Sequence, residues 1–273
     1  MKFPARLAWC TNWRRRAAAR RAAHRFPPGP IAAAAAKALA AAKPGADLAA
    51  ELGALDFRSE REPEITIVVP VHNQLHHTVQ CLKSLASLKP RRAFEIVLAD
   101  DASTDATGAL LPGVPGLRYR RNPANFGFLE TCNAAVESAR GAYVALLNND
   151  TVVLPGWLDA LIDTFDEHPG AGLVGSMLLW PDGRLQEAGS LVANNGGGWN
   201  VGRDGDPDHW RYNHVRAADY CSGASIAIPR ALWRRLGAFD RDFAPGYYED
   251  TDLAFRVRQS GADIARKNAH SPV

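Results

Sequence analysis

Two short polar clusters in the middle of the chain carry side chains that could hold a nucleotide and a metal ion. Asp100-Asp101 and Asn148-Asn149-Asp150 each follow a hydrophobic run of about six residues. A carboxylate at Asp100 or Asp101 could accept the imide N–H of a uracil or thymine ring. The same pair could instead lie in a solvated turn in which Ser103 or Thr104 caps the next helix. The pair alone leaves both interpretations open.

The cluster Asn148-Asn149-Asp150 supplies oxygen atoms, which are the ligands that hard divalent cations prefer. Mg²⁺ or Mn²⁺ commonly takes one or two carboxylates and completes its shell with substrate phosphates and water. Asp150 could be one such ligand, with diphosphate oxygens in the remaining positions. A plain turn before the helix predicted from Pro155 would use the same residue types, so the tripeptide alone is weak evidence.

A third acidic group, Glu249-Asp250-Thr251-Asp252, follows Gly246-Tyr247-Tyr248. Acidic residues in the first turn of a helix interact favourably with its dipole, and that alone could explain them. Behind two tyrosines, the same group also suits a general base in a pocket wall. Asn133 shares a helical face with apolar neighbours and needs a polar partner, either a buried backbone group or the site.

The elements that must position these clusters follow from the hydrophobic pattern. Short apolar runs predict buried strands, and helical spacing between them predicts amphipathic helices. This alternation favours an α/β fold with a doubly wound, mainly parallel sheet. Ligands of such sheets bind beyond the carboxyl ends of the strands, where Pro70-Val71-His72-Asn73 and the first two clusters lie. The predicted strands cover 65–69, 94–99, 117–120, 142–147 and 171–179, and the predicted helices 75–88, 104–111, 126–139, 155–168 and 249–259.

The second half of the chain is less regular. Residues 219–228 could return to the sheet, and residues 194–214 are predicted to form a long loop rich in Gly, Asn, Asp and Trp. Loops of this length inside a compact domain are usually functional or disordered. Trp199 and Trp210 lie in this loop, where aromatic rings could stack on an acceptor sugar or simply pack locally. We expect a small mixed region on the acceptor side of the sheet.

Taken in order, the motifs PVHN, DDASTD, RNxxNFGF, NND and YYEDTD resemble the family 2 glycosyltransferases, which have the GT-A fold. The resemblance covers roughly residues 64–264. It is closest to the rhamnosyltransferase-like members that build bacterial surface polysaccharides. Residues 221–224 and 230–240 also match the acceptor-side stretch of the family.

The resemblance implies an inverting, metal-dependent transfer from a nucleoside-diphosphate sugar to a glycan or a lipid-linked glycan. It assigns Asp250, with Glu249 beside it, to catalysis, and Asp150 to a divalent metal, Mn²⁺ or Mg²⁺. Asn148 departs from the first acid of the family's DxD motif and lowers the local negative charge. The implied donor-binding residues are Pro70, Val71, Asn73, Asp100, Asp101, Asn125, Gly127, Asn148 and Asn149, and Trp199, Trp210, Tyr247 and Tyr248 are predicted on the acceptor side.

Two other functions remain open from the sequence: a module that binds a nucleotide sugar without transferring it, and a nucleotidyltransferase. The acidic group around Asp250 favours transfer to a hydroxyl, and the first strand is not followed by a glycine-rich triphosphate signature. The chain stops soon after Asp263-Ile264, so it could be a fragment, a shortened variant or a module completed by a partner. In this interpretation His270 is a displaced candidate for the histidine with which the family often helps to hold the metal.

Residues 1–62 are predicted to be a basic extension, followed by the GT-A domain over 63–273. Ten Lys and Arg residues precede the first acid, Asp47, whereas acids outnumber bases from Glu64 onward. The extension could be solvated and partly helical. It could also contact anionic lipid through residues 1–43, with Trp9 and Trp13 as anchors. No recognised motif supports nucleic-acid binding.

The four cysteines are far apart and form no CxxC pair, which favours buried thiols in a reducing compartment. No apolar stretch approaches the length of a membrane span, and no secretory signal is recognisable. We expect a cytoplasmic protein, with peripheral membrane contact left open by the basic extension.

Overall fold

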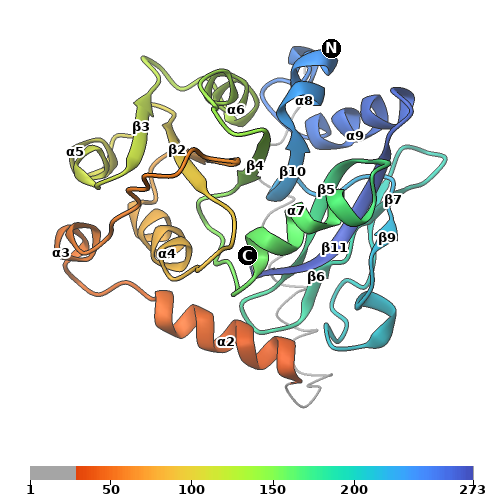
Figure 1. The fold of residues 1–273 in the computed structure, drawn as a ribbon, viewed down its shortest axis with the longest axis horizontal. Coiled ribbons are helices and arrows are strands. Elements are labelled where there is room, and N and C mark those ends of the chain that lie inside the picture. Colours follow the sequence, from red (N-terminus) through yellow and green to blue (C-terminus); the bar gives the residue numbers. More distant parts are fainter. Residues whose placement is uncertain (1–28, 273) are drawn as a thin grey trace, which may run out of the picture.

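A nine-stranded sheet runs through the computed structural model, which describes residues 29–272 (Figure 1). The strand order is β3-β2-β1-β4-β10-β5-β11-β9, with β6 paired to β5. Neighbours β3, β2, β1 and β4 are parallel, and β10 runs antiparallel between β4 and β5. The strands are β1 Ile65–Val71, β2 Phe94–Asp100, β3 Leu117–Arg121, β4 Tyr143–Leu147, β5 Ala171–Leu179, β6 Leu185–Glu187, β9 Arg216–Ala217, β10 Ser225–Pro229 and β11 Asp263–Pro272, and a separate hairpin pairs β7 Ser190–Val192 with β8 Gly198–Asn200.

Helices cover both faces of the sheet because each face of the central strands is apolar. All seven residues of β1 are buried, as expected for a strand with neighbours on both sides and helices on both faces. One core cluster packs α4 and α7 on the sheet, and a second packs α6, α8 and α9 on the opposite face. The helices are α2 Pro30–Ala42, α3 Leu48–Gly53, α4 Leu75–Ala86, α5 Thr107–Leu110, α6 Phe128–Glu137, α7 Trp157–Glu167, α8 Arg230–Leu236 and α9 Glu249–Gln259.

The predicted α/β fold with a mainly parallel sheet is confirmed, and the differences have local causes. The helix predicted over 104–111 begins only at Thr107, because the side-chain oxygen of Asn73 accepts the N–H groups of Thr104 and Asp105 and holds them outside the helix. A 3-10 turn over Leu111–Gly113 follows it. The loop predicted over 194–214 contains β8 and a 3-10 turn at Trp210–Tyr212. Beyond α9 the chain forms β11, which runs parallel to β5 and places His270 opposite Met177. The direction of the His270 side chain lies outside the described part of the structure.

Part of the predicted basic extension packs against the domain. Ala35 and Ala42 of α2 are buried, and α2 contacts α4 and β11. Lys83 of α4 fastens the segment by pairing with Glu51 at 2.6 Å and donating to the carbonyl of Lys43 at 3.0 Å. No helix within the described residues is long and apolar enough to cross a membrane. The predicted anchors Trp9 and Trp13 lie outside the described residues.

Three of the four cysteines, Cys81, Cys132 and Cys221, are buried free thiols, as predicted. Burial raises the pKa of the Cys81 thiol to about 12, so this group stays protonated at neutral pH. Cys10 lies outside the described residues.

Candidate functional site

The polar clusters predicted at the strand ends meet at one edge of the sheet. Val71 pairs with Asp100 at the ends of β1 and β2, and the N–H of Asp101 donates to the Val71 carbonyl at 2.7 Å. On the other side of β1, the N–H of Asn148 donates to the carbonyl of Ala224 at 3.0 Å. The turn before β10 therefore joins this edge and lies beside the end of β4. Pro70 and Val71 are buried in β1, so these two residues shape the edge from inside.

Asp100 is a buried structural carboxylate. Its side chain is 0% exposed and accepts hydrogen bonds from the Ser103 N–H at 2.8 Å, the Tyr119 hydroxyl and Arg121. Burial alone would raise the pKa of Asp100, but the hydrogen bonds from Ser103 and Tyr119 and the charge of Arg121 outweigh it, and the pKa is lowered. The structure places Asp100 as the holder of the turn after β2, and not as the open base-contacting ligand that was predicted.

Asp101 holds the start of α6 in place. Its carboxylate accepts from the Asn122 amide at 2.9 Å and from the N–H groups of Phe126 and Gly127 at 2.8 Å each. Gly127 has φ +83° and ψ 169°, a conformation open almost only to glycine, and an added Cβ would lie 3.2 Å from the carbonyl oxygen of Pro245. Asp101 and Gly127 therefore determine the backbone conformation at the start of α6, which lies between the end of β2 and the loop that precedes α9.

His72, which was not among the predicted site residues, connects the Asp101 turn to Asn125. Its Nδ1 lies 2.7 Å from the Asp101 carbonyl, and its Nε2 lies 3.2 Å from the amide of Asn125. Asn73 uses its side-chain oxygen to accept from the Thr104 N–H at 2.7 Å. The signal for His72 was its place inside the PVHN motif. A histidine between two strand-end clusters is well placed to meet a ligand there.

The cluster after β4 leaves two oxygen groups free for a ligand. The Oδ1 atom of Asn148 is buried without a hydrogen-bond partner among the described residues, and Asp150 is exposed with no hydrogen bond or ion pair to any of them. Asn149 differs, because its amide donates to the Thr78 hydroxyl at 2.9 Å. A buried, unpaired polar atom needs a partner, so Asn148 and Asp150 are the residues that fit a cation.

The described side chains form no cluster of three or more His, Cys, Asp or Glu that could hold a metal without help. This fits a cation that takes one carboxylate from the protein and most of its other ligands from a diphosphate and water. Asp150 is the exposed carboxylate that could serve such a cation, and the unpaired Asn148 oxygen follows the same strand.

Asp250 is fixed from two sides at the start of α9. Its Oδ2 accepts the Gly223 N–H at 3.0 Å, and its Oδ1 accepts the Thr251 N–H at 2.6 Å. Gly223 lies in the same turn as Ala224, which binds Asn148, so one turn connects the two clusters. A carboxylate held in this way keeps free lone pairs in a fixed direction, which suits a general base.

Glu249 is half-buried beside Asp250, and its Oε2 has no hydrogen-bond partner among the described residues. Burial, and after it the neighbouring charge of Asp250, raises the pKa of Glu249, although the N–H groups of Glu249 and Tyr247 act in the opposite direction. Two adjacent carboxyl groups with different surroundings are typical of an acid–base site.

The residues predicted on the acceptor side fall into two places. The Tyr248 hydroxyl donates to the Gly196 carbonyl at 3.5 Å, which brings the β7–β8 hairpin toward the start of α9. Trp199 of that hairpin is 70% exposed, and Tyr247 is 88% exposed. Trp210 does not join them, because its 3-10 turn follows Asp208, whose carboxylate accepts the Ile31 N–H of α2 at 2.9 Å. Figure 1 shows the β7 region and α2 in different parts of the molecule.

Asn133 finds the partner that its buried position requires in the backbone. Its amide donates to the Phe239 carbonyl at 2.9 Å and its oxygen accepts the Phe239 N–H at 3.0 Å. Asn133 therefore fastens α6 to the segment after α8 and makes no contribution to the edge.

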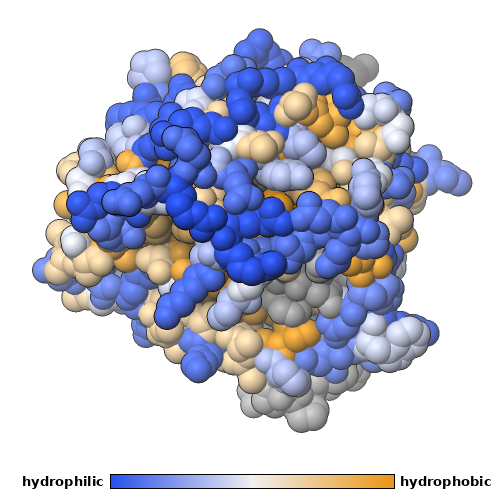
Figure 2. Space-filling view, in the orientation of Figure 1, coloured by the Kyte–Doolittle hydropathy of each residue, from blue (hydrophilic) through white to orange (hydrophobic). Residues whose placement is uncertain are grey.

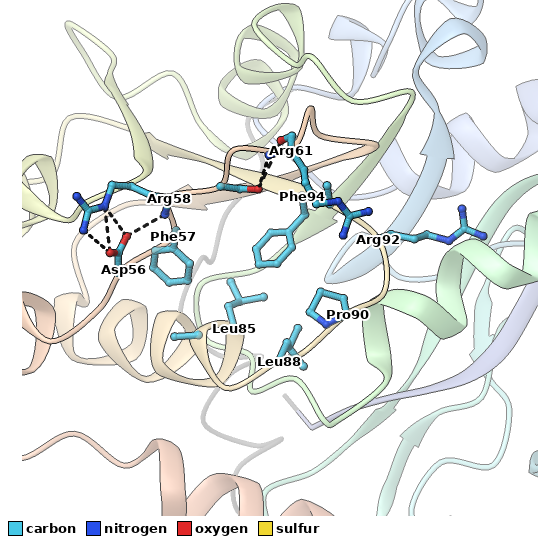
Figure 3. Close-up of a pocket in the computed structure, with 12 residues that line it drawn as sticks. Asp56, Phe57, Arg58, Arg61, Leu85, Leu88, Pro90, Arg92 and Phe94 are labelled. Atoms are coloured by element: carbon cyan, nitrogen blue, oxygen red, sulfur yellow. Dashed lines mark hydrogen bonds and ion pairs between the residues drawn. The ribbon is translucent and has the colours of Figure 1, made fainter.

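A separate hollow of about 260 Å³ lies at the opposite end of the sheet, where β2 begins. Figure 3 shows the apolar side chains of Phe57, Leu85 and Phe94 turned toward it. Its rim is self-paired, since Arg58 binds Asp56 and Arg61 donates to the carbonyl of Arg91 at 3.1 Å. Among the described residues that line it, the buried polar side-chain atom without a partner is the donor Nε of Arg92, whereas the end of β4 presents an unpaired oxygen, that of Asn148.

Comparison with known proteins agrees with this geometry. The family model "Glycosyl transferase family 2" matches residues 66–228. The N-acetylglucosaminyl-diphospho-decaprenol L-rhamnosyltransferase of Mycobacterium tuberculosis is 27% identical over 240 residues, which are 76% of this chain and 77% of that protein. The O-antigen biosynthesis protein RfbC of Myxococcus xanthus is 29% identical over 74% of this chain, which spans 16% of its length.

Solved structures share the fold. GalNAc-T7 with UDP, GalNAc and Mn²⁺ has a TM-score of 0.62 at 16% identity, covering 78% of this chain and 44% of its own. The mannosyltransferase PcManGT of Pyrobaculum calidifontis, in complex with GDP-Man and Mn²⁺, has a TM-score of 0.58 at 21% identity, covering 89% and 68%. The fold is that of the GT-A glycosyltransferases. Because the family model covers more than half of the sequence, the chain belongs to glycosyl transferase family 2.

Proposed function

We propose that this chain transfers a sugar from a nucleoside-diphosphate sugar to an acceptor hydroxyl and inverts the anomeric configuration. The observation that carries the proposal is the turn 222–224, which binds Asn148 on one side and Asp250 on the other. It brings the free oxygens after β4 and a fixed carboxylate to one edge of the sheet. Donor and acceptor groups can then be held on opposite sides of one reacting carbon.

Donor binding is assigned to residues at the strand ends. Asp150 and Asn148, which have oxygens without a partner among the described residues, would hold a divalent cation with the diphosphate. His72 and Asn125, which contact each other beyond the end of β1, would meet the nucleotide. When bound, the cation would neutralise charge on the departing nucleoside diphosphate. Asp101 would act indirectly: it fixes the conformation of the turn at Gly127, and this turn would contact the nucleotide.

Asp250 is assigned as the general base. Hydrogen bonds from the Gly223 N–H and the Thr251 N–H fix the direction of its carboxylate. The carboxylate takes the proton of the acceptor hydroxyl while that oxygen attacks the anomeric carbon, and the bond to the diphosphate breaks on the opposite face. A single displacement of this kind inverts the configuration. Positioning and charge stabilisation supply most of the rate enhancement.

The acceptor is proposed to be a glycan or a lipid-linked glycan of a bacterial surface polysaccharide. The names of the mycobacterial and myxococcal relatives support this class. Tyr247, Tyr248 and Trp199 are the exposed aromatic groups around Asp250 that can stack on a sugar ring.

A transfer assay tests the function. The full chain, with Mn²⁺, is incubated with UDP-, dTDP- and GDP-sugars and a short-chain N-acetylglucosaminyl-diphospho-lipid acceptor, and the product linkage is read by NMR. One donor should give a product of inverted configuration. Metal-dependent nucleotide binding without any transfer would instead identify a binding module, and a product of retained configuration would contradict the assignment of Asp250.

A further inference from the structure

The outer face of α2 is apolar and basic, as is typical of a surface that contacts an apolar and anionic partner. Ala35 and Ala42 face the domain, while the exposed positions of the helix are alanines, Pro30 and Lys37. The stretch from Gly29 to Ala46 contains no acidic residue. Figure 2 shows pale orange residues along the edge of the molecule where Figure 1 places α2. Nothing in the proposed transfer reaction uses this helix.

An exposed tryptophan lies at the amino end of the same helix. Trp210 is 71% exposed, the His209 ring stacks on it at 5.8 Å, and the Arg211 guanidinium lies 5.8 Å from its centroid. Asp208 fixes this turn to α2 by accepting the Ile31 N–H. A large exposed ring with a cation beside it is the side-chain pair that anchors peripheral proteins at the headgroup level of a bilayer.

The acidic side chains near Trp210 make contacts within the protein, although the buried Oδ2 atom of Asp208 has no hydrogen-bond partner among the described residues. Asp204 and Asp182 both pair with Arg184, at 2.8 and 2.9 Å. Asp206 accepts the Asp208 N–H at 2.9 Å, and Asp208 caps α2. Their charges are therefore partly compensated, and Lys37 and Arg211 remain exposed toward a partner.

The chain that leads into α2 supplies the rest of the positive charge. Residues 1–28 hold eight Lys and Arg residues and no Asp or Glu, and they join the described structure at Gly29 beside Asp208. Each basic residue near an anionic membrane surface adds attraction, and the effect accumulates. A polyanion such as RNA would match the charge, but it would leave the exposed alanines of α2 without an apolar partner.

From these observations we propose that the outer face of α2 and the turn 208–211 dock on a bilayer containing anionic lipid. Trp210 inserts at the headgroup level, and Lys37 and Arg211 neutralise lipid phosphates, while the net positive charge of residues 1–28 adds to the attraction. The surface includes neither Asp150 nor Asp250, so the inference does not depend on the proposed transfer reaction. In this proposal Trp210 contacts the membrane, whereas Trp199 is available to contact the acceptor sugar.

Vesicle co-sedimentation tests the proposal with the full chain. Wild-type protein should pellet with phosphatidylglycerol/phosphatidylcholine vesicles and not with phosphatidylcholine alone, and high salt should release it. Lys37→Glu changes two charge units, so it should weaken partitioning roughly 30-fold. Trp210→Ala should also weaken it, while Trp199→Ala, which removes an equally exposed ring from the β7–β8 hairpin, should leave it unchanged.

Thermal melting of each variant shows whether it is folded, so that lost partitioning can be assigned to the surface. Equal partitioning of wild type, Lys37→Glu and Trp210→Ala would overturn the proposal. Equal loss in the Trp210 and Trp199 variants would also overturn it, as would binding to single-stranded RNA without binding to anionic vesicles.

Discussion

The Oδ2 atom of Asp250 lies 3.0 Å from the backbone nitrogen of Gly223, whose N–H it accepts. The next residue, Ala224, accepts the N–H of Asn148, so a three-residue turn fixes the base relative to the end of β4. Neither the Asp250 group nor the polar group after β4 identifies a site by itself. The distance between them is set by the register of β10 on β4, where Ser225 pairs with Leu147. Catalysis by positioning depends on this kind of rigid support.

Replacing Asp250 by Asn should abolish proton transfer and keep donor binding. The amide cannot take a proton from the acceptor, and loss of a general base costs about 10²–10⁴-fold in turnover. Asp252→Asn is the matched control, because that carboxylate already pairs with Arg256 at 2.6 Å. Initial rates and nucleotide titrations of both variants check this. Near-normal turnover in Asp250→Asn would remove Asp250 from its role.

Glu249→Gln should stabilise the protein at neutral pH. The folded state raises the pKa of Glu249 above its ordinary 4.5, so the folded protein binds the proton more tightly than the unfolded chain. The ionisation of Glu249 therefore lowers the free energy of unfolding as the pH rises from about 4.5 through the higher pKa that Glu249 has in the folded protein. The variant should melt higher than wild type at pH 7, and the difference should shrink below pH 4.5. A lower melting temperature at pH 7 would contradict the raised pKa of the half-buried Glu249 carboxyl group.

Asp100→Asn should destabilise the fold by about 3 kcal/mol, because it leaves Arg121 and the Tyr119 hydroxyl without their buried acceptor. Urea unfolding measures the loss. Asp150→Asn is the control, since Asp150 is exposed and has no partner among the described residues, and it should unfold like wild type. Equal stability of the Asp100 variant and wild type would show that the carboxylate is not structural.

Gly127→Ala should lower stability by about 1–3 kcal/mol and weaken nucleotide binding. The backbone at Gly127 has φ +83°, and the new Cβ would lie 3.2 Å from the Pro245 carbonyl oxygen. Gly113→Ala is the control, because no atom lies within 4 Å of its Cβ position. Thermal melting and nucleotide titration compare the two. If both variants behave alike, the strained turn has no part in shaping the donor site.

The sequence predicted the sheet well because its strands are short apolar runs with no helical period. The all-buried β1 is an example, and the polar residues after it had to lie at the carboxyl edge. The resemblance to the family then assigned a role to each polar cluster at that edge.

Side-chain partners were less accessible to sequence reasoning. Asp100 and Asp101 are adjacent, yet one is buried against Arg121 and the other holds Gly127, which depends on the twist and register of β2 and β3. Trp199 and Trp210 lie in one irregular stretch, but the capping of α2 by Asp208 fixes the turn that carries Trp210 at that helix. Such long-range contacts leave no periodic signal in the chain.

Calorimetric titration of UDP, dTDP and GDP into the full chain, with and without Mn²⁺, tests whether the end of β4 holds a metal ion and a diphosphate. One nucleotide should bind only with Mn²⁺, and Asp150→Ala should abolish this binding while the variant stays folded. Metal-independent binding, or unchanged binding in Asp150→Ala, would contradict the assignment of the end of β4 as the metal and diphosphate site.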